Sequence, residues 1–222
     1  MKIRTHRQSG LSLFEVALVV ATVVLLALVF WPMLTRSKRS SRIGCTGNLK
    51  QVGLSYRLFS NDHQDKFPFA VSKGDGGTLE FVKTSQVFRH FEAMSNELVT
   101  PKVLVCPVDF AKGGRQRATD FLTGLANSNV SYFVGLDGDE SKNNRILSGD
   151  RNITGGTLLR NGFLRVLSSD APAGWTEAIH KDGNAISGNI GLSDGSAQQV
   201  MPAELQKRLQ AQDLRVIRLA IP

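Results

Sequence analysis

Glu15 is the only charged residue between Leu11 and Thr35, in a stretch made almost wholly of apolar side chains. A charged side chain at the centre of a bilayer costs about 2.5 to 3.5 kcal/mol, and such a residue usually has a partner. No cation follows Glu15 within one helical turn. A cut between Gly10 and Leu11 would create an α-ammonium group one turn before the carboxylate, and a neighbouring molecule could offer its own. Either group would give the acid a partner.

The other residue types that could do chemistry are dispersed. The four histidines show no metal-ligand spacing: His6, His63, His90 and His180. Ser193 and Asp194 together with His180 would supply the residue types of a hydrolase triad, but no Gly-x-Ser-x-Gly turn surrounds either Ser193 or Ser196. We therefore predict no catalytic residue and no metal site, and a protein that is not an enzyme.

The densest acidic cluster is Asp137-Gly138-Asp139-Glu140. Carboxylate oxygens of this kind suit a hard cation such as calcium, but the ligand spacing of an EF-hand is missing and Lys142 follows at once. We predict a solvated turn, with a calcium ion as the alternative, and no other cofactor.

Positive charge is concentrated around the apolar stretch. The formal net charge is +8, and residues 1–42 contain seven Lys and Arg residues against one Glu. Three precede the stretch and four follow it: Lys2, Arg4, Arg7, Arg36, Lys38, Arg39 and Arg42. Residues 43–222 are nearly neutral, so the basicity does not require a nucleic-acid partner.

Residues 16–34 carry no charge and are mostly Val, Leu and Ala. At about 1.5 Å per residue they cover most of a hydrocarbon core of roughly 30 Å. A cleaved secretory signal, the alternative, has a shorter apolar region that ends in small residues, whereas this run ends in Phe30-Trp31-Pro32-Met33. We predict a single uncleaved membrane helix. Long C-terminal domains translocate largely regardless of flanking charge, so we expect a cytoplasmic N-terminus and an exported remainder.

The N-terminus resembles that of type IV prepilins and of the pseudopilins of type II secretion. A short basic leader ends in Gly10 and is followed by LSLFE and the apolar run. The resemblance implies that prepilin peptidase cuts after Gly10 and methylates Leu11, that Glu15 supports docking between subunits, and that Pro32 kinks the helix. Leu11 replaces the phenylalanine that is usual in this family.

Later segments resemble a subset of bacterial prepilin-like proteins. The similar segments are RIGCTGNLKQVGLSYRLFSNDHQDKFP, VLVCPVD and SYFVGLD. The C-terminal mark of this subset is a histidine, a spacer and Asp-Gly inside a hairpin, which correspond here to His180, Asp194 and Gly195. The spacer of 13 residues is longer than usual, and Ser196 stands where a second histidine is common.

The exported part reads as one long helix followed by a small antiparallel sheet, which predicts a pilin-like α+β fold. A 4-3-4-3 spacing places five side chains on one helix face that ends near Asn61: Cys45, Leu49, Val52, Tyr56 and Phe59. The expected parts are a leader at 1–10, a membrane helix at 11–34, its exported continuation at 35–62 and a globular domain at 63–222.

Within the globular domain, four apolar residues at helical spacing predict a second helix: Val87, Phe91, Met94 and Leu98. Branched residues predict strands over 103–106, 130–136, 163–167 and 188–201, and a short helix is expected over 203–214. Asp194-Gly195 suits a two-residue type I′ turn, in which both central residues have positive φ.

Cys45 and Cys106 are the only cysteines. Cys45 leads the apolar stripe of the long helix, and Cys106 ends a branched run that would cross this helix. Export would place both in an oxidising compartment, so we predict a disulfide, with two buried thiols as the alternative.

Three classes of protein compete for this sequence. The expected one is a structural subunit of a type IV pilus-like or type II secretion pseudopilus filament in the inner membrane. Its partners would be prepilin peptidase, other pilin or pseudopilin subunits and inner-membrane lipid. The second is a membrane-anchored periplasmic binding or regulatory module that does not polymerise, and the third is a tethered enzyme.

Overall fold

The computed structural model describes residues 12–34, 38–159 and 162–222. The predicted processing site, Gly10 and Leu11, lies outside the described residues. The chain divides into two compact units, Met1–Ser40 and Ser41–Pro222.

The first unit contains helix α1 (Leu13–Leu34). Its apolar side chains are exposed from Leu13 to Phe30. The helix continues through Pro32 and ends two residues later, where the sequence predicted the end of the membrane segment. The kink at Pro32 stays a prediction.

Helix α2 (Lys38–Asp62) supplies one wall of the core of the second unit. All five residues of the predicted stripe are at most 2% exposed, and the helix ends one residue after Asn61. Gln64 and Asp65 follow with φ of +57° and +58°, which turns the chain away from the helix axis.

Eight short helical segments connect α2 to the sheet. They are η1 (Pro68–Ala70), η2 (Lys73–Asp75), η3 (Leu79–Phe81), α3 (Arg89–Glu92), α4 (Ser95–Leu98), η4 (Pro101–Leu104), α5 (Pro107–Ala111) and η5 (Asn127–Asn129). The predicted second helix is divided into α3 and α4 because Met94, at φ −100° and ψ 26°, leaves the helical region. The predicted strand at 103–106 is wrong: Pro101 and Pro107 each begin a helical turn, a position that suits proline.

Eight strands form an antiparallel sheet in the order β4-β5-β10-β1-β2-β8-β7, with β9 paired to β8. Their bounds are β1 (Tyr132–Gly135), β2 (Ile146–Asp150), β4 (Thr157–Leu158), β5 (Leu164–Ser168), β7 (His180–Asp182), β8 (Ala185–Leu192), β9 (Ala197–Val200) and β10 (Val216–Ala220). A smaller sheet pairs β3 (Ile153–Gly155) with β6 (Ala173–Trp175). The predicted strands at 130–136, 163–167 and 188–201 correspond to β1, β5 and the pair β8–β9.

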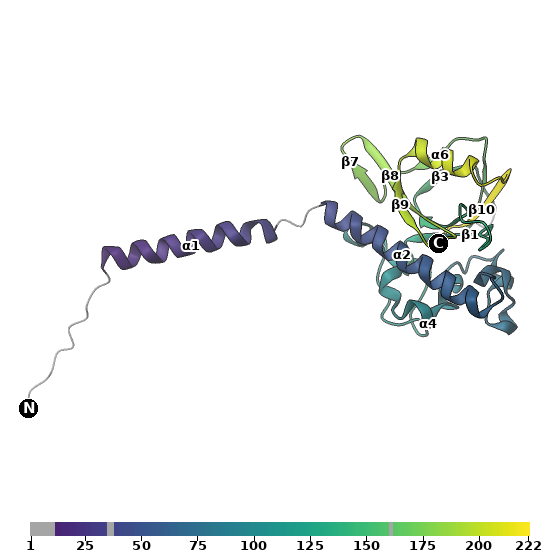
Figure 1. Cartoon of the computed structure of the whole chain (residues 1–222), viewed down its shortest axis with the longest axis horizontal. Helices are drawn as coiled ribbons and strands as arrows, with labels where there is room; N and C mark the ends of the chain where they lie inside the picture. The colour runs from purple at the N-terminus through teal and green to yellow at the C-terminus, as the bar shows by residue number, and fades with distance from the viewer. Residues whose placement is uncertain (1–11, 35–37, 160–161) are drawn as a thin grey trace, which may run out of the picture. The chain divides into compact units, whose positions relative to one another are not determined.

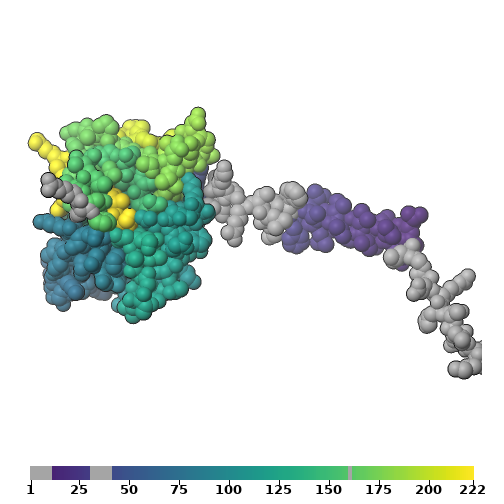
Figure 2. Space-filling model, turned by 180° about the vertical axis from the view of Figure 1, so that it is seen from behind, coloured from purple at the N-terminus to yellow at the C-terminus, as the bar shows by residue number. Residues whose placement is uncertain are grey.

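The large sheet has a hydrophobic core on each face. On β1, Tyr132 and Val134 pack into the core that contains the α2 stripe, whereas Phe133 faces the core of helix α6 (Pro202–Gln210). Figure 1 shows α2 and α6 on opposite sides of the strands. In Figure 2 the residues between α2 and β1 form one side of this unit and the C-terminal strands form the other. The predicted α+β class is confirmed.

The predicted type I′ turn between β8 and β9 is wrong. Gly195 has φ +81°, whereas Asp194 is not among the described residues with positive φ. The Gly195 amide donates to the Leu192 carbonyl at 2.9 Å, and the Leu192 amide donates to the Ser196 carbonyl at 2.9 Å. These bonds close a three-residue loop that needs a single left-handed glycine.

Candidate functional site

Glu15 lies in the first turn of α1 and is paired with Ser12, the residue before the helix. Its Oε2 accepts hydrogen bonds from the Ser12 amide at 2.7 Å and from Ser12 Oγ at 3.1 Å. Ser12 Oγ in turn accepts from the Glu15 amide at 3.3 Å. This reciprocal arrangement is a capping box, which stabilises a helix start. This cap is not among the features predicted from the sequence, although Ser-x-x-Glu before an apolar run is its signal.

The helix that begins at this cap has the composition of a membrane span. The 18 residues Leu13–Phe30 are apolar and long enough to cross a bilayer. Within this stretch Glu15 is the single charged residue, and it lies in the first turn. A charged group near the end of a span reaches the interface more easily than one at its centre, so the position suits both insertion and contact with another polar group.

The disulfide expected from the sequence is present in the second unit. Cys45 and Cys106 are bonded, with their α-carbons 4.7 Å apart and 61 positions apart in the sequence. Cys45 comes from the buried face of α2, and Cys106 lies directly before α5. Both side chains are fully buried. The bond therefore fixes the long helix to the segment between η4 and α5.

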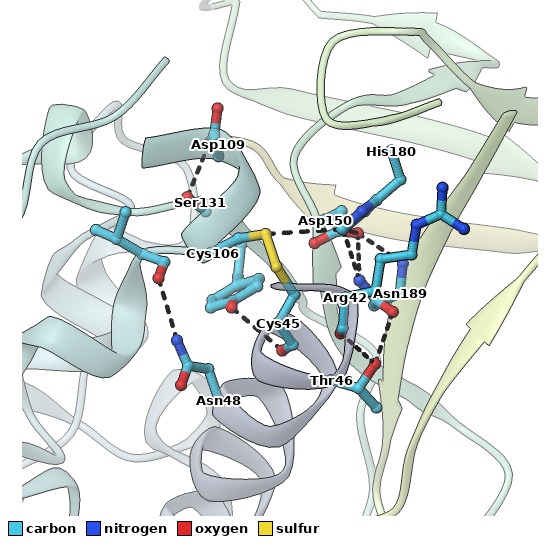
Figure 3. The surroundings of a disulfide bond; sticks show 12 residues. Arg42, Cys45, Thr46, Asn48, Cys106, Asp109, Ser131, Asp150, His180 and Asn189 are labelled. Atoms are coloured by element: carbon cyan, nitrogen blue, oxygen red, sulfur yellow. Dashed lines mark hydrogen bonds and ion pairs between the residues drawn. A yellow bond between two sulfur atoms is a disulfide. The ribbon is translucent and has the colours of Figure 1, made fainter. Parts of the chain in front are cut away.

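His180 lies against this disulfide at the start of β7. Its Nε2 is 3.7 Å from Cys106 Sγ, 3.3 Å from Asp150 Oδ2 and 2.9 Å from Asn189 Nδ2. The His180 side chain is 1% exposed and that of Asp150 is fully buried. Figure 3 shows the imidazole and the carboxylate on the strand side of the disulfide.

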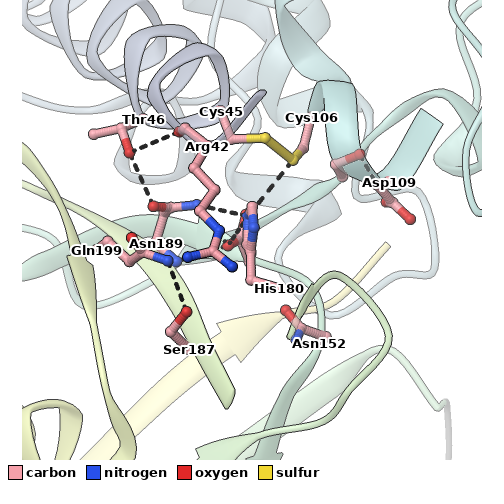
Figure 4. A network of polar contacts seen from close by, with 12 residues as sticks. Arg42, Cys45, Thr46, Cys106, Asp109, Asn152, His180, Ser187, Asn189 and Gln199 are labelled. Carbon is pink, nitrogen blue, oxygen red and sulfur yellow. Dashed lines mark hydrogen bonds and ion pairs between the residues drawn. A yellow bond between two sulfur atoms is a disulfide. The ribbon is translucent and has the colours of Figure 1, made fainter. Parts of the chain in front are cut away.

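Asn189 connects this pair to α2. Asp150 Oδ2 accepts from the Asn189 amide at 2.6 Å and from Asn189 Nδ2 at 2.9 Å. On the other side, Thr46 Oγ1 donates to Asn189 Oδ1 at 3.0 Å (Figure 4). We call Cys45, Cys106, Asp150, His180 and Asn189 the buried cluster. It joins α2, the start of α5 and strands β2, β7 and β8.

Asp194-Gly195, the other part of the predicted motif, lies in the β8–β9 loop and contacts α2 away from the disulfide. A Cβ added at Gly53 would come within 3.1 Å of the Gly195 Cα and carbonyl oxygen, so the β8–β9 loop contacts the helix backbone directly. Asp194 is exposed, and its Oδ1 accepts from the Ser196 amide at 2.8 Å. Gly195 thus contacts α2 itself at Gly53, whereas His180 contacts Cys106, the disulfide partner of Cys45.

The residues considered for a triad do not converge. Ser193 is fully buried and Asp194 is exposed. The partners that His180 contacts are Cys106, Asp150 and Asn189.

The carboxylates considered for calcium are directed to separate partners. Asp137 accepts from the Arg218 amide at 2.6 Å and from its Nε at 2.9 Å. Asp139 accepts from Ser141 Oγ at 2.7 Å, and this hydrogen bond is the main cause of a lowered Asp139 pKa. Glu140 accepts from Ser60 Oγ. Each of the three carboxylates thus has its own protein donor, and the calcium alternative stays a prediction.

His90 is a second buried histidine. Its Nδ1 is 2.7 Å from Thr78 Oγ1, and its Nε2 has no hydrogen-bond partner among the described residues. Burial lowers the His90 pKa to about 4, because the charged imidazolium is poorly solvated there. His90 is therefore neutral near pH 7.

Comparison with known proteins adds no assignment to this geometry. No family model matches the chain, and comparisons with curated proteins and with solved structures found no match.

Proposed function

We propose that the chain is a subunit of a type IV pilus-like or type II secretion pseudopilus filament, with a pilin-like arrangement of its helix and sheet. The observation that carries the proposal is the N-terminal helix, an apolar 18-residue span with a single acid in its first turn. The sequence before it, a basic leader that ends in Gly10, resembles a prepilin leader.

In this proposal Glu15 changes partners during assembly. In the uncut chain its carboxylate accepts from Ser12. After a cut at Gly10, the new ammonium of Leu11 lies at the same helix start, and the ammonium of a neighbouring subunit is an alternative partner. The Ser12 amide and hydroxyl are neutral donors, whereas an ammonium carries a full positive charge. In a low-dielectric environment the ammonium is therefore the stronger partner of the carboxylate, so the exchange favours docking.

Three contacts connect α2 to the rest of the second unit. The Cys45–Cys106 bond, the Thr46–Asn189 hydrogen bond and the Gly53–Gly195 contact fasten the helix to the domain at successive positions. A filament subunit needs such a connection because its helix carries the load of assembly. The disulfide also supports an exported domain, since disulfides persist in oxidising compartments.

The test is assembly in cells that contain a working prepilin peptidase. Cross-linking of membranes should give a ladder of multimers for the wild type, and Glu15→Leu should insert normally but give a strongly shortened ladder. Ser12→Ala is the matched control: it removes the cap hydroxyl, costs the helix about 1 kcal/mol and keeps the carboxylate, so its ladder should stay. A monomer in all three strains would favour the non-polymerising periplasmic module, and an unchanged Glu15→Leu ladder would remove Glu15 from assembly.

A further inference from the structure

We propose that the buried cluster becomes a zinc site when the disulfide is reduced, with Cys45, Cys106, His180 and Asp150 as the four ligands. This inference goes beyond the filament function and does not depend on it.

Two separations between donor atoms of the proposed site fit tetrahedral coordination. Cys106 Sγ is 3.7 Å from His180 Nε2, which is 3.3 Å from Asp150 Oδ2. With zinc bond lengths of about 2.0 to 2.3 Å, two donors on a tetrahedral ion are about 3.3 to 3.8 Å apart. The donor atoms of Cys45, Cys106 and His180 all lie within 4.8 Å of one another. Asp150 is outside this group of three, so zinc binding requires the sulfur atoms, once they are no longer bonded, to rotate about their Cα–Cβ bonds toward the Asp150 carboxylate.

The electrostatics of the buried cluster also suit a zinc ion. Asp150 is fully buried, and its Oδ1 has no hydrogen-bond partner among the described residues. A buried carboxylate is stabilised by a directly coordinated cation. Zn²⁺ and two thiolates together add no net charge, so the reduced, metal-bound cluster keeps the net charge of the disulfide form. Thiolate, imidazole and carboxylate are all ligands that zinc accepts.

The exchange between the two forms is balanced. A dithiol reductant gives two electrons and two protons to the Cys45–Cys106 bond and becomes a disulfide itself. The two thiols that form release their two protons when Zn²⁺ binds. In this proposal a reduced chain holds α2 to the start of α5 through zinc. An oxidised chain holds it through the disulfide that Figures 3 and 4 show.

The test uses the full chain in detergent and cobalt(II) as a spectroscopic substitute for zinc. Oxidised protein and protein reduced with a phosphine, both freed of metal, are titrated with Co²⁺. The reduced chain should bind one equivalent with the visible bands of a tetrahedral ion and a thiolate charge-transfer band, and zinc should abolish both. The oxidised chain should show neither. A reduced chain without these bands overturns the proposal, and this comparison needs no variant.

Two variants then test the ligand set. His180→Gln and Asp150→Asn should each weaken Co²⁺ binding at least about tenfold, as loss of a ligand exceeds the effect of its supporting residues. Asp194→Asn, which changes an exposed carboxylate outside the buried cluster, is the matched control and should bind like the wild type. Circular dichroism of each oxidised variant checks its fold. Unchanged binding by folded His180→Gln would show that the thiolates alone hold the ion and would contradict the proposal.

Discussion

Loss of the Cys45–Cys106 bond should lower the thermal stability of the second unit by a predictable amount. The bond joins residues 61 positions apart, and for a loop of this size the loop-entropy model gives about 4 kcal/mol. For a unit the size of Ser41–Pro222, 1 kcal/mol corresponds to about 2 to 4 °C in Tm, so reduction should lower Tm by roughly 10 °C.

The assay is thermal unfolding of the full chain in detergent, followed by circular dichroism with and without reductant. A chelator is present throughout, so that metal binding to the reduced cysteines does not offset the loss. The double variant Cys45→Ala/Cys106→Ala should match the reduced wild type and should not respond to reductant. A decrease of less than about 2 °C would refute the reasoning, because it would mean that packing of the α2 stripe restrains the same segments without the bond.

Other predictions concern the packing and titration of the same unit. Gly53→Ala should destabilise the second unit despite a gain in helix propensity, because the new Cβ would meet Gly195 at 3.1 Å. Gly47→Ala, where nothing lies within 4 Å of the new Cβ, should stabilise the unit by about 0.5 to 1 kcal/mol in urea unfolding. Equal changes in the free energy of unfolding for the two variants would contradict this. Gly195→Ala should destabilise the hairpin, because φ +81° strains an L-residue; an unchanged urea midpoint would count against it. The folded pKa of His90, about 4, lies below its unfolded value of 6.5, so its contribution to stability is complete above pH 6.5 and falls by roughly 3 kcal/mol as pH decreases to 4. His90→Gln should flatten the stability curve in that window, and an unchanged slope would exclude His90 as its cause.

The long helix could be predicted because its signal is local. The 4-3-4-3 stripe from Cys45 to Phe59 depends only on helix periodicity, and all five residues are buried as expected. Strands β2 and β10 could not be predicted in this way, because their apolar residues form no sustained pattern. Strand β2, Ile146–Asp150, includes Ser148, Gly149 and Asp150, and β10 alternates exposed and buried positions over only a few residues.

The buried cluster could be predicted only in part. His180 was singled out through a resemblance, and Cys45 and Cys106 through their number and positions. Asp150 and Asn189 were missed because their proximity to His180 depends on the register of β2, β8 and β7, which no sequence spacing reveals. Conversely, the capping box of Ser12 and Glu15 is predictable, because its signal, Ser-x-x-Glu before an apolar run, is local.

The mass and N-terminal sequence of the chain recovered from membranes test the proposed filament function most directly. The recovered chain should start at Leu11 and carry one added methyl group, and a bulky residue in place of Gly10 should leave the leader attached. An intact leader in cells with a working prepilin peptidase, or a cut near Trp31, would contradict it.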